Sequence, residues 1–230
     1  MKRFSLVFAA PLAVVSLSSI DARASSCGYS PSAGIDWSEC SKKSLMLEES
    51  DFTGANLTGT DFTLTGLRGS SFANADLEKA TLIRAWLEGA KADKARFDKV
   101  EGYRSVFRNI SANSASFVSA ELQRADFTGA QLVKATFAKA ELGRANFWKA
   151  KLGDVRFSLA NLSRASLVGA DVVGPMDFEN AFLFLTRIEG VDLSKATGLD
   201  QAQVNLACGD AATKLPQGLT APPNWPCPKD

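Results

Sequence analysis

Large apolar residues recur at every fifth position through most of the chain. From Leu47 to Val172 this series holds leucine or phenylalanine, with Ala92, Gly102 and Ala112 as the internal exceptions. An amphipathic helix would space its apolar residues three and four apart, and a half-buried strand would alternate them. The five-residue period therefore predicts a chain that turns after each pentapeptide and points every large residue into one core.

Two further columns accompany the large residues. The position two before each large residue is small and mostly alanine, as at Ala55, Ala75 and Ala125. Both apolar columns can face inward only if the remaining positions face outward. The position between the two columns often holds Asp or Asn: Asp51, Asn56, Asp61, Asp76, Asp126, Asn146, Asn161 and Asp171.

These columns resemble the A-(D/N)-(L/F)-x-x pattern of the pentapeptide-repeat family, as in 55–59 (ANLTG) and 125–129 (ADFTG). The match extends from about residue 44 to about residue 197. The resemblance implies an all-β fold, a right-handed quadrilateral parallel β-helix with four pentapeptides in each coil. A single coil cannot bury its core, so we expect roughly eight coils stacked at ~4.8 Å.

The order of core residues is also predicted. Positions ten apart lie on opposite faces of a four-sided coil. From Phe117 to Leu162 the large residues alternate between Phe and Leu, so one pair of faces offers Phe and the other offers Leu. The small residues Ala92, Gly102 and Ala112 leave space that the neighbouring phenylalanines are expected to fill.

The register breaks once and divides the chain into four segments. The large residue after Val172 is Phe178, six positions later, so one extra residue lies near Gly174-Pro175. This is either a tolerated insertion or a functional loop. The expected segments are a signal peptide at 1–24, an N-terminal cap at 25–46, the β-helix at 47–197, and a C-terminal capping helix and Pro-rich tail at 198–230.

Residues 1–24 have the features of a secretory signal peptide. Lys2 and Arg3 begin it, an apolar run follows, and 22–24 (ARA) forms a cleavage site. A membrane anchor is one alternative, but the run is short and broken for a span. A lipoprotein attached at Cys27 is another, but the preceding residues fit poorly. The mature chain is expected in the periplasm or outside the cell.

The four cysteines lie in pairs near the two ends of the mature chain. An even number in an exported chain favours disulfides. Three connectivities are open, and proximity favours Cys27–Cys40 and Cys208–Cys227. The second would tie the tail to a short helix capped by Asp200. Some family members dimerise end to end, which this tail would hinder, so a monomer is expected.

One surface pattern has a period of twenty, or one coil. It places five arginines in a column: Arg84, Arg104, Arg124, Arg144 and Arg164. Glutamates lie three positions before some of them, so one interpretation is a face neutralised by ion pairs, each contributing only ~0–1 kcal/mol. The other is a stripe that binds an anionic partner.

Three aromatic residues fall at outward positions: Trp86, Tyr103 and Trp148. They are candidate interface anchors, although single exposed aromatic residues are also normal.

Composition argues against catalysis. The chain contains no histidine, which is the commonest general base and metal ligand. No nucleophile motif, phosphate loop or metal-ligand spacing is present, so we expect neither an enzyme nor a cofactor, metal or small-molecule substrate. The net charge of +1 excludes a strongly basic or acidic protein.

The leading hypothesis is an exported, non-catalytic scaffold that binds another protein. The alternative is a binder of polysaccharide, nucleic acid or lipid head groups through the arginine column. Some pentapeptide-repeat proteins are DNA-mimicking topoisomerase inhibitors, but that role needs an acidic surface and access to the cytoplasm.

Overall fold

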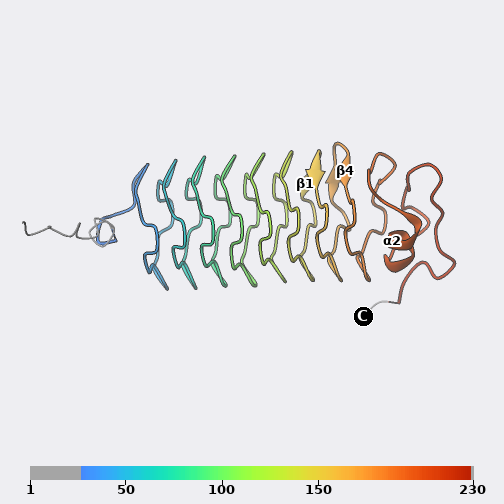
Figure 1. Ribbon diagram of the computed structural model, residues 1–230, viewed down its shortest axis with the longest axis horizontal. Coiled ribbons are helices and arrows are strands. Elements are labelled where there is room, and N and C mark those ends of the chain that lie inside the picture. Colours follow the sequence, from blue (N-terminus) through green and yellow to red (C-terminus); the bar gives the residue numbers. More distant parts are fainter. Residues whose placement is uncertain (1–26, 229–230) are drawn as a thin grey trace, which may run out of the picture.

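The computed structural model describes residues 27–228 as a rod of stacked coils (Figure 1). Parallel bridges join residues twenty positions apart, from Asp36 with Asn56 to Asn146 with Ser166. Because each coil contains four pentapeptides, the rod is a four-sided parallel β-helix. The fold expected from the five-residue period is thereby present, and the expected signal peptide at 1–24 lies outside the described residues.

Backbone hydrogen bonds explain why coils stack in this register. In each pentapeptide, the residue before the large one donates its N–H to the preceding coil. The large residue and the corner residue two positions later donate to the following coil. Around Leu57 these bonds are Asn56 N–H to Ile35 O at 2.9 Å, Leu57 N–H to Asp76 O at 2.7 Å, and Gly59 N–H to Glu78 O at 2.9 Å.

Each corner of the coil is a tight turn with a left-handed residue. The turn closes with a hydrogen bond such as Ala85 N–H to Leu82 O at 3.0 Å, and the corner residue Arg84 has φ of 54°. Positive φ at the third residue is typical of a type II turn. The corner side chain therefore projects outward, and the same corner recurs in each coil.

The Asp or Asn column satisfies a donor that the coil leaves over. The N–H of the residue after each large one has no backbone partner in a neighbouring coil. Where the residue two positions before this N–H is Asp or Asn, its side chain accepts the hydrogen bond. Examples are Thr53 to Asp51 at 2.9 Å, Thr128 to Asp126 at 3.0 Å and Ser163 to Asn161 at 3.0 Å. This local bond gives the repeat its preference for Asp and Asn.

Phenylalanines form stacked columns in the core. The rings of Phe97 and Phe117, one coil apart, have centroids 4.8 Å apart and are nearly parallel at 5°. Across the core, Phe107 meets Phe117 edge to face at 6.0 Å. Between these faces a Cβ on Gly102 would lie 2.7 Å from Leu122 Cδ2. The Leu122 side chain of the next coil therefore takes the space beside Gly102, a role that the sequence analysis gave to the neighbouring phenylalanines.

The four short strands surround the register break. β1 (Lys151–Leu152) pairs with β3 (Asp171–Val172) at an offset of twenty, whereas β2 (Val155–Arg156) pairs with β4 (Met176–Asp177) at an offset of twenty-one. The extra residue therefore lies between β3 and β4, where Gly174 and Pro175 form the bulge.

The regular coil begins earlier than the sequence suggested. An irregular cap was expected over 25–46, but coil bridges start at Asp36 and Trp37 is buried. Lys42 occupies a core position. Its ammonium donates to Cys27 O at 2.5 Å and lies 3.5 Å from the centre of the Trp37 ring. A lysine is accommodated here because the open first coil offers these partners, and burial lowers its pKa.

The C-terminal end is covered by a helix and a tail. α2 (Gln201–Leu206) starts at Asp200, which forms a capping box with Gln203. The buried Gln203 amide also donates to Phe178 O and Ala181 O, both at 2.8 Å. It thereby closes the last coil, and α2 lies at this end of the rod in Figure 1.

Disulfides hold both ends in the pairing that proximity favoured, Cys27–Cys40 and Cys208–Cys227. In the tail, Trp225 Nε1 donates to Ala207 O at 2.7 Å, and its ring lies against Gly209, where a Cβ would be 2.3 Å from the ring. The tail is thus packed on the end of the rod as well as bonded to it.

Candidate binding face

All five arginines of the column occupy the same corner of successive coils. Their φ values lie between 54° and 61°, and all five side chains are exposed. Each backbone N–H donates to the next coil, as Arg124 does to Gly143 O at 2.8 Å. The coil backbone therefore fixes the Cα positions, and the guanidinium groups project from a rigid edge parallel to the rod.

The column is not neutralised by its glutamates. Within residues 27–228, Arg84, Arg104, Arg124 and Arg144 make no ion pair within 4.0 Å. The glutamates three positions earlier in sequence stack on one another instead, through the bridges Glu101 with Glu121 and Glu121 with Glu141. Along Arg84 to Arg144, two parallel charge columns of opposite sign thus run along one face without ion pairs between them.

Other arginines of the rod behave differently. Arg96 forms ion pairs with Asp76 and Glu78, and Arg108 donates to Asp126 at 2.6 Å. The hydrogen bond that Arg108 donates to Asp126 raises the pKa of Arg108. Arginines elsewhere on this rod therefore form ion pairs with carboxylates, whereas the four arginines above form none within the described chain.

Like charges can be held at the coil spacing at low cost. Two full charges about 5 Å apart in water repel by about 1 kcal/mol, and flexible side chains reduce this further. The buried core and the backbone hydrogen bonds between coils stabilise the fold by more than this repulsion costs. What remains is a concentrated positive edge that attracts anionic groups.

Two of the three sequence-predicted aromatic residues flank the column. Tyr103 is 37% exposed, and the Arg104 guanidinium lies 5.3 Å from its ring centre. Trp86 lies on the next face, two residues beyond Arg84, with the Arg68 guanidinium 5.6 Å from its ring. Trp148 is 47% exposed but lies at the following corner, under the Lys149 ammonium at 4.2 Å.

An exposed apolar group at the end of this face was missed by the sequence analysis. Phe182 pairs with Asn161 in the strand position of the glutamate column, and Leu185 takes the corner position after Arg164. Phe184 lies between them in the turn. The signal was present, because both phenylalanines stand beside the large core position Leu183 and must point outward.

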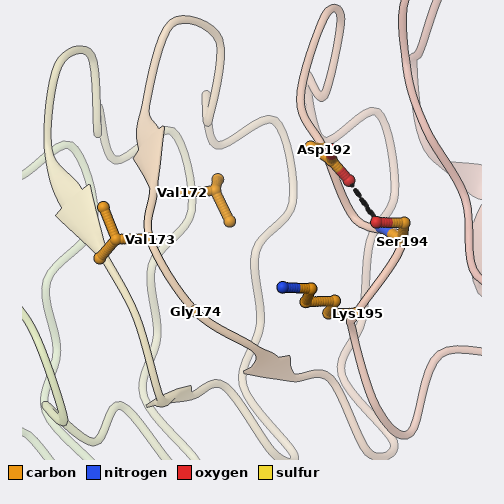
Figure 2. Close-up of a pocket in the computed structure, with 6 residues that line it drawn as sticks. All are labelled: Val172, Val173, Gly174, Asp192, Ser194 and Lys195. Carbon is orange, nitrogen blue, oxygen red and sulfur yellow. Dashed lines mark hydrogen bonds between the residues drawn. The ribbon is translucent and has the colours of Figure 1, made fainter.

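The register break creates a shallow pocket of about 120 Å³ (Figure 2). Val172, Val173 and Gly174 line one side, and Asp192, Ser194 and Lys195 line the other. Asp192 accepts hydrogen bonds from Ser194 and pairs with Lys214 at 2.9 Å, and these contacts hold the pKa of its carboxyl well below the usual range. The Asp192 carboxylate is therefore held by Ser194 and Lys214, and its low pKa makes it a weak base.

Two other kinds of site were sought in the described part of the chain. Over residues 27–228, no group of three or more Cys, Asp or Glu side chains could hold a metal ion. No helix within the same range has the length and apolar character needed to span a membrane.

Comparisons agree with this architecture. A family model described as Pentapeptide repeats matches residues 47–69, 64–98, 103–138 and 140–174 in eight copies. None of the curated proteins matches the sequence.

Among solved structures, a trypsin-treated variant of QnrB1, a plasmid-mediated fluoroquinolone resistance protein, is 19% identical with a TM-score of 0.55. The alignment covers 77% of this chain and 91% of that one. HetL, a pentapeptide repeat protein involved in heterocyst differentiation regulation in the cyanobacterium Nostoc sp. strain PCC 7120, is 25% identical with a TM-score of 0.30, covering 85% of this chain and 95% of its own. At this identity, the similarity to QnrB1 shows the fold alone.

Proposed function

Because the chain belongs to the pentapeptide-repeat family, we propose that it is a non-catalytic, exported scaffold that binds an acidic protein surface through its arginine column. Family membership implies a right-handed quadrilateral β-helix, a rigid rod with long regular faces. The observation that carries the proposal is that Arg84, Arg104, Arg124 and Arg144 form no ion pair within the described chain. Arginine and tyrosine side by side are typical of binding hot spots.

Export is supported by two features. The sequence of residues 1–24 fits a cleaved signal peptide. Both disulfides, Cys27–Cys40 and Cys208–Cys227, would persist in an oxidising compartment and would be unusual in the cytosol. The proposed location is the periplasm or the exterior of the cell.

A protein partner fits this face better than a uniform polyanion. The column of Glu101, Glu121 and Glu141 runs beside the arginines on the same face. An anionic polysaccharide or nucleic acid lying on the arginines would also meet these carboxylates. A protein can instead place acidic groups on one column and basic or polar groups on the other, which gives specificity through charge complementarity.

Affinity capture tests the proposal. The mature chain, residues 25–230, is used as bait in the organism's own envelope fraction at low and moderate salt. A variant with Arg104, Arg124 and Arg144 changed to Ala should lose the captured protein. A control with Lys94, Lys134 and Lys139 changed to Ala removes the same charge from exposed left-handed corners elsewhere on the rod, and it should retain the protein.

Each result has a definite meaning. Loss of the protein from the arginine variant alone supports the proposal. Equal capture by both variants would refute a role for the column. Capture of polysaccharide or nucleic acid in place of protein, with steep loss at moderate salt, would replace the proposal with the polyanion alternative.

A further inference from the structure

The arginine column ends abruptly in apolar residues. At the corner one coil after Arg164 stands Leu185, and the turn and strand positions beside it hold Phe184 and Phe182. The exposed fractions are 49% for Phe182, 41% for Phe184 and 39% for Leu206 at the end of α2. The same face thus changes from charged to apolar between two adjacent coils.

Backbone contacts place this apolar group directly against the last arginine. Arg164 N–H donates to Phe184 O at 2.8 Å, and Leu185 N–H donates to Leu206 O at 2.7 Å. The two phenylalanine rings are nearly parallel, at 10°, with centroids 6.2 Å apart. We call Phe182 and Phe184 the ring pair. It lies one coil spacing beyond the column, on the same rigid face.

The cap leaves the ring pair uncovered. α2 takes the place of the next coil on this face, and Gln203 closes the core by binding Phe178 O and Ala181 O. The ring pair lies outside this closure and stays about half exposed. Paired aromatic rings on a rigid element are the kind of feature that a partner's large apolar side chain can bury.

We infer that the arginine column and the ring pair form one recognition surface for an acidic segment of a partner protein that carries a large apolar side chain at one end. The inference rests on the proposed function, because it assigns the partner's charge to the same arginines. Charge complementarity selects the acidic part, and the ring pair selects the apolar end. A second copy of this chain related by a two-fold axis perpendicular to the rod would place arginines on arginines, whereas an axis parallel to the rod would place them on the glutamate column. Self-association is therefore one of the outcomes that the experiment below distinguishes.

The distance between the arginines and the ring pair also predicts the length of the partner's acidic segment. From Arg104 to the ring pair there are four coil steps, or about 19 Å at ~4.8 Å each. An extended chain covers about 3.3 Å per residue, so about six residues span this distance. The partner segment is therefore a short acidic stretch of roughly that length, followed or preceded by an aromatic or leucine side chain.

Labelled synthetic peptides test this directly by fluorescence anisotropy. The probes are six acidic residues with Trp at the C-terminal end, the same with Trp at the N-terminal end, and the same with Ala in place of Trp. One of the Trp peptides should bind the mature chain at least tenfold more tightly than the Ala peptide. The Ala peptide should bind weakly and depend on salt.

Variants separate the two halves of the surface. Changing Phe182 and Phe184 to Ser should remove the advantage of Trp but leave Ala-peptide binding unchanged. The unchanged Ala-peptide binding shows that the Ser variant is folded, and changing both residues to Leu should restore most of the advantage because an apolar surface returns. Changing the exposed Leu159 and Val173 to Ser is the matched control, and it should have no effect.

The outcomes distinguish this inference from the proposed function. Trp and Ala peptides that bind equally, but only when Arg104, Arg124 and Arg144 are present, would overturn the ring-pair role and leave the arginine column as a binding site. Peptide binding that is indifferent to the arginines would overturn both. Binding to vesicles of anionic phospholipid that exceeds peptide binding, or a self-associating chain that needs the ring pair, would also overturn the inference.

Discussion

At the scale of single residues, the arginine column has a conformational cost. Each arginine adopts a left-handed backbone conformation that disfavours side chains with a Cβ by roughly 1–2 kcal/mol. Glycine fits this conformation, because the next corner of the coil holds glycine in several coils. These residues are Gly69, Gly89, Gly129 and Gly169. Arginine therefore stands where glycine would satisfy the backbone better, as do the lysines, serines and asparagines at other corners of the rod.

This argument predicts the effect of Arg124→Gly. Relief of left-handed strain outweighs the extra entropy of an unfolded glycine, so the free energy of unfolding should rise by up to about 1 kcal/mol. Binding through the column should fall. Denaturant unfolding measures the first effect, with Arg124→Ala as the control that keeps the strain. A glycine variant less stable than the alanine variant would contradict the argument.

At the scale of the repeat unit, the Asx bond links charge to stability. Burial raises the pKa of Asp126, but hydrogen bonds from Thr128 and Arg108 outweigh it, and the pKa lies below the usual value. The pKa of Asp76 is lowered in the same way. Burial raises it, but hydrogen bonds from Arg96 and from the Glu78 N–H outweigh this effect. Carboxylates at this position thus stabilise the folded state only while ionised.

The pH dependence of stability follows from the direction of these shifts. Unfolded aspartate titrates near pH ~3.9. Above that value the stabilisation is fully present, and it is lost as the pH falls through the lower pKa of the folded state. Melting temperature should therefore be flat above about pH 5 and fall below about pH 4.

Asp126→Asn keeps the acceptor for Thr128 N–H but removes the titrating charge, so it should flatten part of this fall. Asp154→Asn is the control, because no hydrogen bond to the Asp154 side chain occurs in residues 27–228. An Asp126→Asn variant with the same acid sensitivity as the parent chain would refute the account.

The same unit explains how far the sequence could be interpreted. A pentapeptide carries its own core residue, small residue and Asx acceptor, so the columns, the extra residue near Gly174 and the cap at Asp200 could be predicted locally. The ends do not repeat. Lys42 violates the pattern and was assigned to an irregular cap, although the first coil supplies Cys27 O as its partner. The state of the arginines depended on side-chain distances that no five-residue pattern contains.

At the scale of the whole molecule, the arginines form a column only because they recur every twenty residues, which is the length of one coil. From Phe117 to Leu162 the large core residues alternate Phe and Leu with a period of ten, but the arginines recur with a period of twenty. Removing ten residues from this region therefore preserves the order of core residues, but it moves every later residue to the opposite side of the rod. Removing twenty preserves both.

Two deletions use this difference to test whether alignment of the arginines matters. Deletion of 118–127 and deletion of 118–137 each remove Arg124 and place a Leu in the position of Leu122 and a Phe in that of Phe127. Both variants should fold with similar melting temperatures. In the longer deletion Arg104 and Arg144 become neighbours in one column, whereas in the shorter one Arg144 and Arg164 move to the opposite corner.

The partner captured by the parent chain should bind the twenty-residue deletion with little loss. It should bind the ten-residue deletion at least tenfold more weakly, because there only Arg84 and Arg104 of the column stay aligned, while Lys134 takes the position of Arg124 and Asp154 that of Arg144. Equal binding by both would mean that charge content and not alignment determines recognition. Failure of the ten-residue deletion alone to fold would show that the two pairs of faces are not interchangeable, and the account of the Phe and Leu core would then be wrong. The pair of deletions thus tests the core and the column in one comparison, with the sequence composition of the surface almost unchanged.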